Sequence, residues 1–105
     1  MARVLAIVAD LMLASRVTTS LRESGHEVEQ AGSLPSGLDG VDLVVADLDA
    51  AAPEELAATG LPVIGFYRHT DAETKARADA AGLGIAVPRS RMVRELPELV
   101  NRQLT

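Results

Sequence analysis

The side chains that could do chemistry follow the apolar runs of the sequence, where the strands of a parallel sheet would end. Asp10 follows VLAIVA (4–9), and Asp47 and Asp49 lie at the end of DLVVADL (42–48) and just beyond it. Parallel α/β sheets bind ligands beyond the carboxyl ends of their strands, so these carboxylates would meet at one edge. Because Mg²⁺ prefers carboxylate oxygens, Asp10 and Asp47 are candidate metal ligands. Asp10 could instead only cap a helix.

Polar residues also follow the last two predicted strands. Tyr67 ends one of them, and Arg89 comes just after the other, where its guanidinium could bind a phosphoryl group. His69 lies two residues before Asp71 at the same predicted edge. With Asp49 these two residues could form a polar cluster that binds a metal ion or moves a proton. The alternative is that His69 is only a solvated loop residue.

These residues would be positioned by alternating strands and helices. Apolar runs predict strands at 4–9, 26–31, 42–48, 61–67 and 84–87, and helical periodicity predicts helices at 11–24, 53–59, 70–81 and 92–104. The glycine- and proline-rich segment 32–40 predicts a loop or at most one helical turn. This β-then-α alternation predicts an α/β fold, a flavodoxin-like three-layer sandwich with a five-stranded parallel sheet in the order 2-1-3-4-5.

Two helix boundaries can be predicted from short motifs. Thr70-Asp71-Ala72-Glu73 matches a capping box, in which the Thr70 hydroxyl would cap the third predicted helix. Pro97 lies inside the last helical pattern, so that helix either begins near Glu95 or is kinked at the proline.

The amino-acid composition limits the classes of function that the chain could have. The 105 residues, of which 48% are hydrophobic, predict one domain over residues 1–105. A net charge of −5 argues against nucleic acid or an anionic membrane as the partner. The chain has no cysteine, which excludes disulfides and thiolate metal sites. Without a membrane span, a signal peptide, a nucleophile elbow or a dinucleotide motif, we expect a soluble, cytoplasmic protein that is not an enzyme.

Over nearly its whole length, the chain resembles the receiver domains of bacterial response regulators, the CheY-like superfamily. The run DLVVADL resembles the strand that carries the phosphoacceptor aspartate, and LPVIGFYRHTDAETKARADAAG resembles the fourth strand and helix. VPRSRMVRELPELV resembles the fifth strand, the turn with a lysine, and the last helix. The resemblance implies that Asp47 is the phosphoacceptor, which takes a phosphoryl group from a histidine kinase while Mg²⁺ is bound beside it.

The same comparison implies that the phosphorylation site is degenerate. Val8 and Ala9 take the positions of the acid pair that binds Mg²⁺ in receivers. Tyr67 replaces a threonine or serine, and Arg89 replaces the lysine, at the positions that contact the phosphate. Ala86 stands in place of the aromatic switch residue. The second and third helices of the receiver pattern would be shortened.

We therefore predict a stand-alone, receiver-like regulatory protein of bacterial signal transduction that works without normal phosphorylation. It would bind a protein partner, or a second copy in a homodimer, through the face that the fourth helix, fifth strand and fifth helix form in receivers. One alternative is a conventional Mg²⁺-dependent receiver that a histidine kinase phosphorylates at Asp47. Another is a flavodoxin-like module that binds a small molecule over Asp47, Tyr67 and His69.

Overall fold

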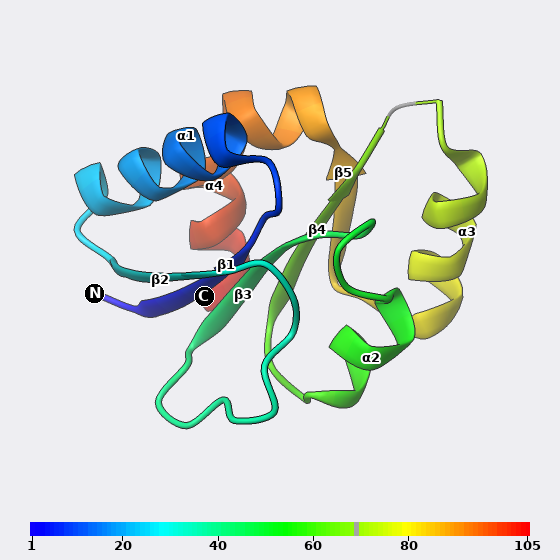
Figure 1. Cartoon of the computed structure of the whole chain (residues 1–105), viewed down its shortest axis with the longest axis horizontal. Coiled ribbons are helices and arrows are strands. Elements are labelled where there is room, and N and C mark those ends of the chain that lie inside the picture. Colours follow the sequence, from blue (N-terminus) through cyan, green and yellow to red (C-terminus); the bar gives the residue numbers. More distant parts are fainter. Residues whose placement is uncertain (69) are drawn as a thin grey trace.

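A computed structural model describes residues 1–68 and 70–105 as a parallel sheet between two layers of helices (Figure 1). The strands are β1 (Arg3–Ile7), β2 (Glu27–Ala31), β3 (Leu43–Asp47), β4 (Val63–Tyr67) and β5 (Ile85–Pro88). The helices are α1 (Leu11–Glu23), α2 (Pro53–Ala58), α3 (Ala72–Ala81) and α4 (Arg89–Leu104). The sheet order is β2-β1-β3-β4-β5 and every pair is parallel, which confirms the predicted flavodoxin-like topology.

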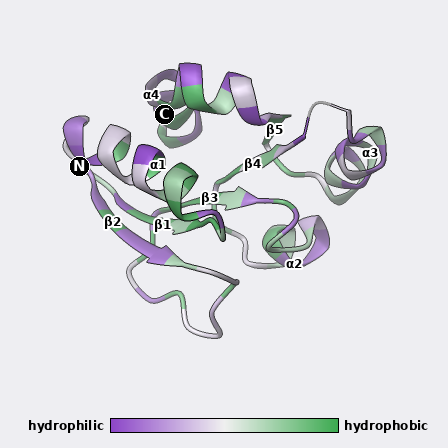
Figure 2. Cartoon of the chain, turned by 45° about the horizontal axis from the view of Figure 1, so that its top comes forward, coloured by the Kyte–Doolittle hydropathy of each residue, from purple (hydrophilic) through white to green (hydrophobic). Residues whose placement is uncertain are grey.

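The sheet is buried on both faces. Helices α1 and α4 cover one face, and α2 and α3 cover the other (Figures 1 and 2). Successive residues of a strand point to opposite faces, so each central strand contributes to both cores. In β4, Ile64 and Phe66 pack on the α1/α4 side, whereas Val63 and Tyr67 pack on the α2/α3 side. This double burial explains the continuous apolar runs of the central strands.

The connection from β2 to β3 contains no helix over residues 32–42, all of which the structure describes. The segment is a loop, as predicted for residues 32–40, and the second helix of the receiver pattern is absent from this connection. Leu34, Leu38 and Val41 are half-buried against the core on the α2/α3 side. They cover part of the sheet face that a helix would otherwise cover. Helix α2, between β3 and β4, is short as predicted, with six residues.

Helix α3 begins one residue later than the capping-box pattern predicts. Its cap is Asp71 rather than Thr70: the Thr74 N–H donates to Oδ1 at 3.0 Å, and the Thr74 hydroxyl donates to Oδ2 at 2.6 Å. The side-chain hydrogen bond from Thr74, together with its backbone N–H, holds the pKa of Asp71 below its usual value. A carboxylate is a stronger acceptor than a hydroxyl, which explains why the acid takes the cap position.

Helix α4 begins at Arg89, directly after β5, and not near Glu95. Pro97 therefore lies inside the helix, where its ring removes one backbone hydrogen bond. The buried stripe of Met92, Leu96 and Leu99 holds α4 against the sheet across this defect. Within residues 1–68 and 70–105, no helix combines the length and the apolar character needed to cross a membrane.

The cap assignment of α3 can be tested by substitution. We expect Asp71→Ala to lower the thermal unfolding midpoint at neutral pH, because the variant loses both hydrogen bonds to Thr74. The pKa of Asp71 is depressed in the folded state, so its contribution is full above the unfolded pKa and is lost as the pH falls through the folded pKa. The difference between wild type and variant should therefore shrink in acid. Thermal unfolding followed by circular dichroism at several pH values measures this difference in midpoint.

Thr70→Ala is the control, because Thr70 is the residue that the sequence pattern places at the cap. We expect little change in the unfolding midpoint from this substitution. An equal loss of stability in the two variants would contradict the assignment of Asp71 as the cap.

Candidate functional site

Asp47 lies at the carboxyl end of β3, between β1 and β4 in the centre of the sheet. The residue is buried, with 7% of its surface exposed. Its Oδ1 accepts a hydrogen bond from the backbone N–H of Asp49 at 2.9 Å. Burial of a carboxylate is unfavourable unless hydrogen bonds and counter-charges replace water, so this bond satisfies part of the requirement.

The other oxygen of Asp47 faces the guanidinium of Arg89. The Nη2 of Arg89 lies 3.7 Å from Oδ2, which is an ion-pair distance and longer than a hydrogen bond. Arg89 is the first residue of α4, and β4 separates its strand, β5, from β3. Its side chain is 39% exposed, whereas that of Asp47 is 10% exposed. Water therefore screens the pair on one side only.

Asp10 has a different role from the one a metal site would require. It caps α1: its Oδ1 accepts hydrogen bonds from the N–H groups of Met12, at 2.9 Å, and Leu13, at 3.1 Å. The capping alternative is therefore confirmed. In the described part of the chain, no three His, Asp or Glu side chains are grouped so that they could hold a metal ion.

Mg²⁺ in proteins is usually held by one or two carboxylates together with several waters. Asp47 offers one such carboxylate, whose Oδ1 also accepts the Asp49 N–H, and the guanidinium of Arg89 lies beside it. Mg²⁺ binding at Asp47 stays a prediction.

Tyr67 belongs to the core on the α2/α3 side and is 7% exposed. The residue that pairs with Asp47 across the β3–β4 ladder is Phe66, which packs on the opposite side of the sheet. Tyr67 thus contributes apolar packing next to Leu48 and Ala78. Its predicted role as a contact for phosphate stays a prediction.

The predicted polar cluster contains residues with separate local roles. Asp49 is exposed, and its backbone N–H binds Asp47. Asp71 accepts two hydrogen bonds from Thr74 as the cap of α3. His69 lies outside the residues that the structure describes. The cluster itself stays a prediction.

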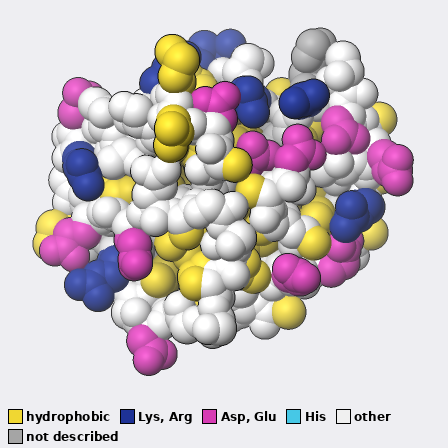
Figure 3. All heavy atoms as spheres, viewed as in Figure 1, with side chains coloured by type: hydrophobic (Ala, Val, Ile, Leu, Met, Phe, Trp, Pro, Cys, Tyr) yellow, Lys and Arg dark blue, Asp and Glu magenta, His cyan; other side chains and the backbone are white. Residues whose placement is uncertain are grey.

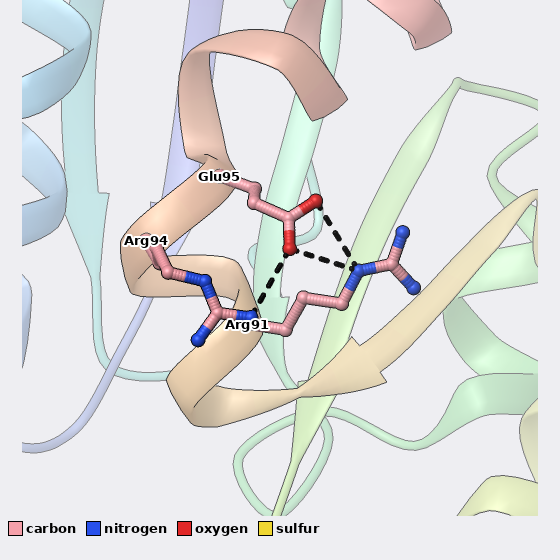
Figure 4. A network of polar contacts seen from close by, with 3 residues as sticks. All are labelled: Arg91, Arg94 and Glu95. Carbon is pink, nitrogen blue, oxygen red and sulfur yellow. Dashed lines mark hydrogen bonds and ion pairs between the residues drawn. The ribbon is translucent and has the colours of Figure 1, made fainter.

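Helix α4 carries a charged network on its surface. Glu95 binds two arginines (Figure 4): the Nε of Arg91 and the Nη2 of Arg94 each lie 3.3 Å from its Oε2. The four-residue spacing of Arg91 and Glu95 was a signal for this pair. In Figure 4 the Arg91 side chain extends from α4 towards β4 and β5. Arg91 therefore lies on the side of α4 that borders β5.

This chain has the fold of response-regulator receiver domains. A response-regulator receiver domain protein from Clostridium thermocellum superposes with a TM-score of 0.83 at 18% identity, over 99% of this chain and 94% of that one. A CheY-like receiver domain protein from Methanospirillum hungatei gives 0.82 at 18% identity, over 99% and 94%. An orphan response regulator of H. pylori gives 0.80 at 17% identity, over 99% and 97%. The predicted resemblance is confirmed for the fold.

Similarity in sequence is much weaker than similarity in structure. No protein-family model matches the chain, and no curated protein matches it in a sequence comparison. The fold is therefore the shared property, and the residues at the end of the sheet have to be interpreted from their own geometry.

The Asp47–Arg89 pair can be measured by a double-mutant cycle. We expect Arg89→Gln to lower the free energy of unfolding, because Asp47 then stays buried without its counter-charge. The coupling between Arg89→Gln and Asp47→Asn should be about 1 kcal/mol, as for a partly screened ion pair. Urea unfolding followed by circular dichroism measures all four proteins.

The control cycle combines Asp47→Asn with Arg102→Gln. The Arg102→Gln substitution removes the same charge as Arg89→Gln, but in the last turn of α4, away from Asp47. This cycle should give a coupling close to zero. A similar coupling in the two cycles would mean that Asp47 responds to the net charge of the protein and not to Arg89.

Proposed function

We propose that this protein is a receiver-like regulator in response-regulator signalling, which acts by binding another protein and has no catalytic activity. We further propose that Asp47 is not phosphorylated in normal use. The receiver fold supports the signalling role. The observation that carries the second proposal is that Asp47 is buried while Asp10, the acid that follows β1, caps α1.

Phosphoryl transfer to an aspartate needs a free carboxylate oxygen and cations that neutralise the charge of the transferring group. In this chain, Oδ1 accepts the Asp49 N–H, and Oδ2 faces the Arg89 guanidinium. Asp47 is also buried, and Asp10, the acid that follows β1, is used as a helix cap. These features favour a structural role, in which Asp47 and Arg89 join the ends of β3 and β5.

The proposed binding surface is the α3–β5–α4 face, which corresponds to the fourth helix, fifth strand and fifth helix of the receiver pattern. Strand β5 is at the edge of the sheet, so among the described strands it pairs only with β4. On α3, the exposed residues Ala72, Ala76 and Ala80 repeat every fourth position and leave a flat stripe. A flat stripe of small side chains lets another helix or strand approach closely. The occupant we propose is a protein, either a different one or a second copy of this chain.

Phosphorylation can be tested with acetyl phosphate and Mg²⁺. We expect the intact mass of the wild-type protein to stay unchanged, because Asp47 is buried and Asp10 is used as a helix cap. A receiver that accepts phosphate under the same conditions serves as the positive control. A gain of one phosphoryl mass that is absent from Asp47→Asn would overturn this part of the proposal and establish a conventional receiver.

The binding surface can be tested with two matched variants, each of which replaces an exposed alanine by arginine. Ala76→Arg places a bulky charge on the stripe of α3, and Ala58→Arg places the same charge at an exposed position of α2. Proteins captured from a lysate of the source cells, and self-association by sedimentation, are compared with wild type. We expect Ala76→Arg to lose specific association and Ala58→Arg to retain it. Equal association of both variants would contradict the proposed surface.

A further inference from the structure

Arginines gather beside the Asp47–Arg89 pair, although the chain as a whole has a net charge of −5. A hollow of about 680 Å³ lies between the first turns of α1 and α4, and Arg16, Arg89 and Arg94 all line it. Figure 3 shows Lys and Arg side chains gathered over the amino-terminal part of α4 and the end of β4. A hollow of this size lies within the range of small-molecule sites in proteins.

The hollow has more positive than negative charge. Its three arginines are opposed by one carboxylate in the lining, Asp10, whose Oδ1 is bound to two N–H groups of α1. Arg94 is paired with Glu95, and Arg89 with Asp47. Among residues 1–68 and 70–105, Arg16 makes no ion pair. The charge of Arg16 is therefore available to a ligand.

The donors around the hollow suit a phosphate group. A guanidinium presents paired N–H groups that match phosphate oxygens, and three arginines from two helices line the hollow. The hydroxyl of Ser90 lines the same hollow. Ser90 is also in the first turn of α4, where Pro88 provides no side-chain cap, so the positive end of the helix dipole adds to the attraction.

The hollow continues into a groove that suits an uncharged group. A second hollow of about 340 Å³ between α1 and α4 shares Arg16 and Val93 with the first. Its lining combines hydroxyls, such as that of Thr19, with apolar side chains, such as that of Leu96. Met12, which is 82% exposed, forms an apolar wall of the first hollow. A ligand with a phosphate at one end could thus lay its uncharged part along the groove.

We propose that this arginine groove, lined by Arg16, Arg89, Ser90, Val93 and Arg94, binds a small organic molecule through its phosphate group. The phosphate is held by ionic hydrogen bonds and is not transferred, so no bond forms or breaks. The site lies between α1 and α4.

Titration of the ¹⁵N-labelled protein tests the proposal. The probes are inorganic pyrophosphate, which offers phosphate alone, and phenyl phosphate, which adds an apolar ring; phenol is the control without phosphate. We expect both phosphate probes to give saturable shifts in the amides of the first turns of α1 and α4, and phenol to give none there. Shifts that do not saturate, or equal shifts with phenol, would overturn the proposal.

Two variants of equal charge locate the site. Arg16→Gln should weaken the binding of phenyl phosphate about tenfold, as for the loss of one charge-assisted hydrogen bond. Arg102→Gln, at the other end of α4, should leave the Kd within about twofold of wild type. Equal weakening by both variants would mean that the net charge, and not the groove, attracts the anion. Asp47→Asn should still bind, since Asp47 is not in the lining; loss of binding there would place the phosphate elsewhere.

Discussion

Burial of both faces of a short parallel sheet is the constraint on which the rest of this structure depends. The central strands are fully buried, and a side chain in their middle has no route to water. Polar and charged groups are therefore excluded from the middle of the central strands and appear where these strands end. This is why Asp47 and Arg89 come together at one edge while the covered faces are apolar. The chemistry that the protein can do is confined to that edge and to the outer surfaces of the helices.

The edge itself is governed by one buried carboxylate. Asp47 is held by a backbone N–H and a guanidinium, and the guanidinium is in place only because α4 begins directly after β5. A longer turn after Pro88 would move Arg89 away from the sheet. The start of α4 at Arg89 thus stabilises the charge of Asp47, and that charge in turn favours Arg89 at this place.

The sequence predicted the parts of the structure that depend on local patterns. The strand order followed from continuous apolar runs and intervening helical periodicity, and Asp10 was recognised as a possible cap from its place before Leu11. Segment 32–40 was predicted as a loop or at most one helical turn from its glycines and prolines, and it is a loop. The sequence did not show that Leu34 and Leu38 of this loop pack on the core.

Tertiary contacts explain why other features could not be predicted from the sequence. Pro97 was a reason to expect the last helix to start late, but the buried stripe from Met92 to Leu99 outweighs the hydrogen bond that the proline removes. The sequence named Asp47 and Arg89 as candidates for one site. Their separation of 3.7 Å depends on the register of three strands and on the start of α4, which no local pattern specifies.

Helix α4 connects the features of this protein because its sides face different surroundings. Its buried stripe packs against the sheet, its first residue neutralises Asp47, and Arg91 extends over the side that borders β5. Arg94 is shared, since it lines the hollow beside α1 and also binds Glu95, the partner of Arg91. A phosphate that draws Arg94 away from Glu95 would leave this half-buried carboxylate to Arg91 alone. The charge presented next to β5 would then change, which gives a physical route from the arginine groove to the α3–β5–α4 face.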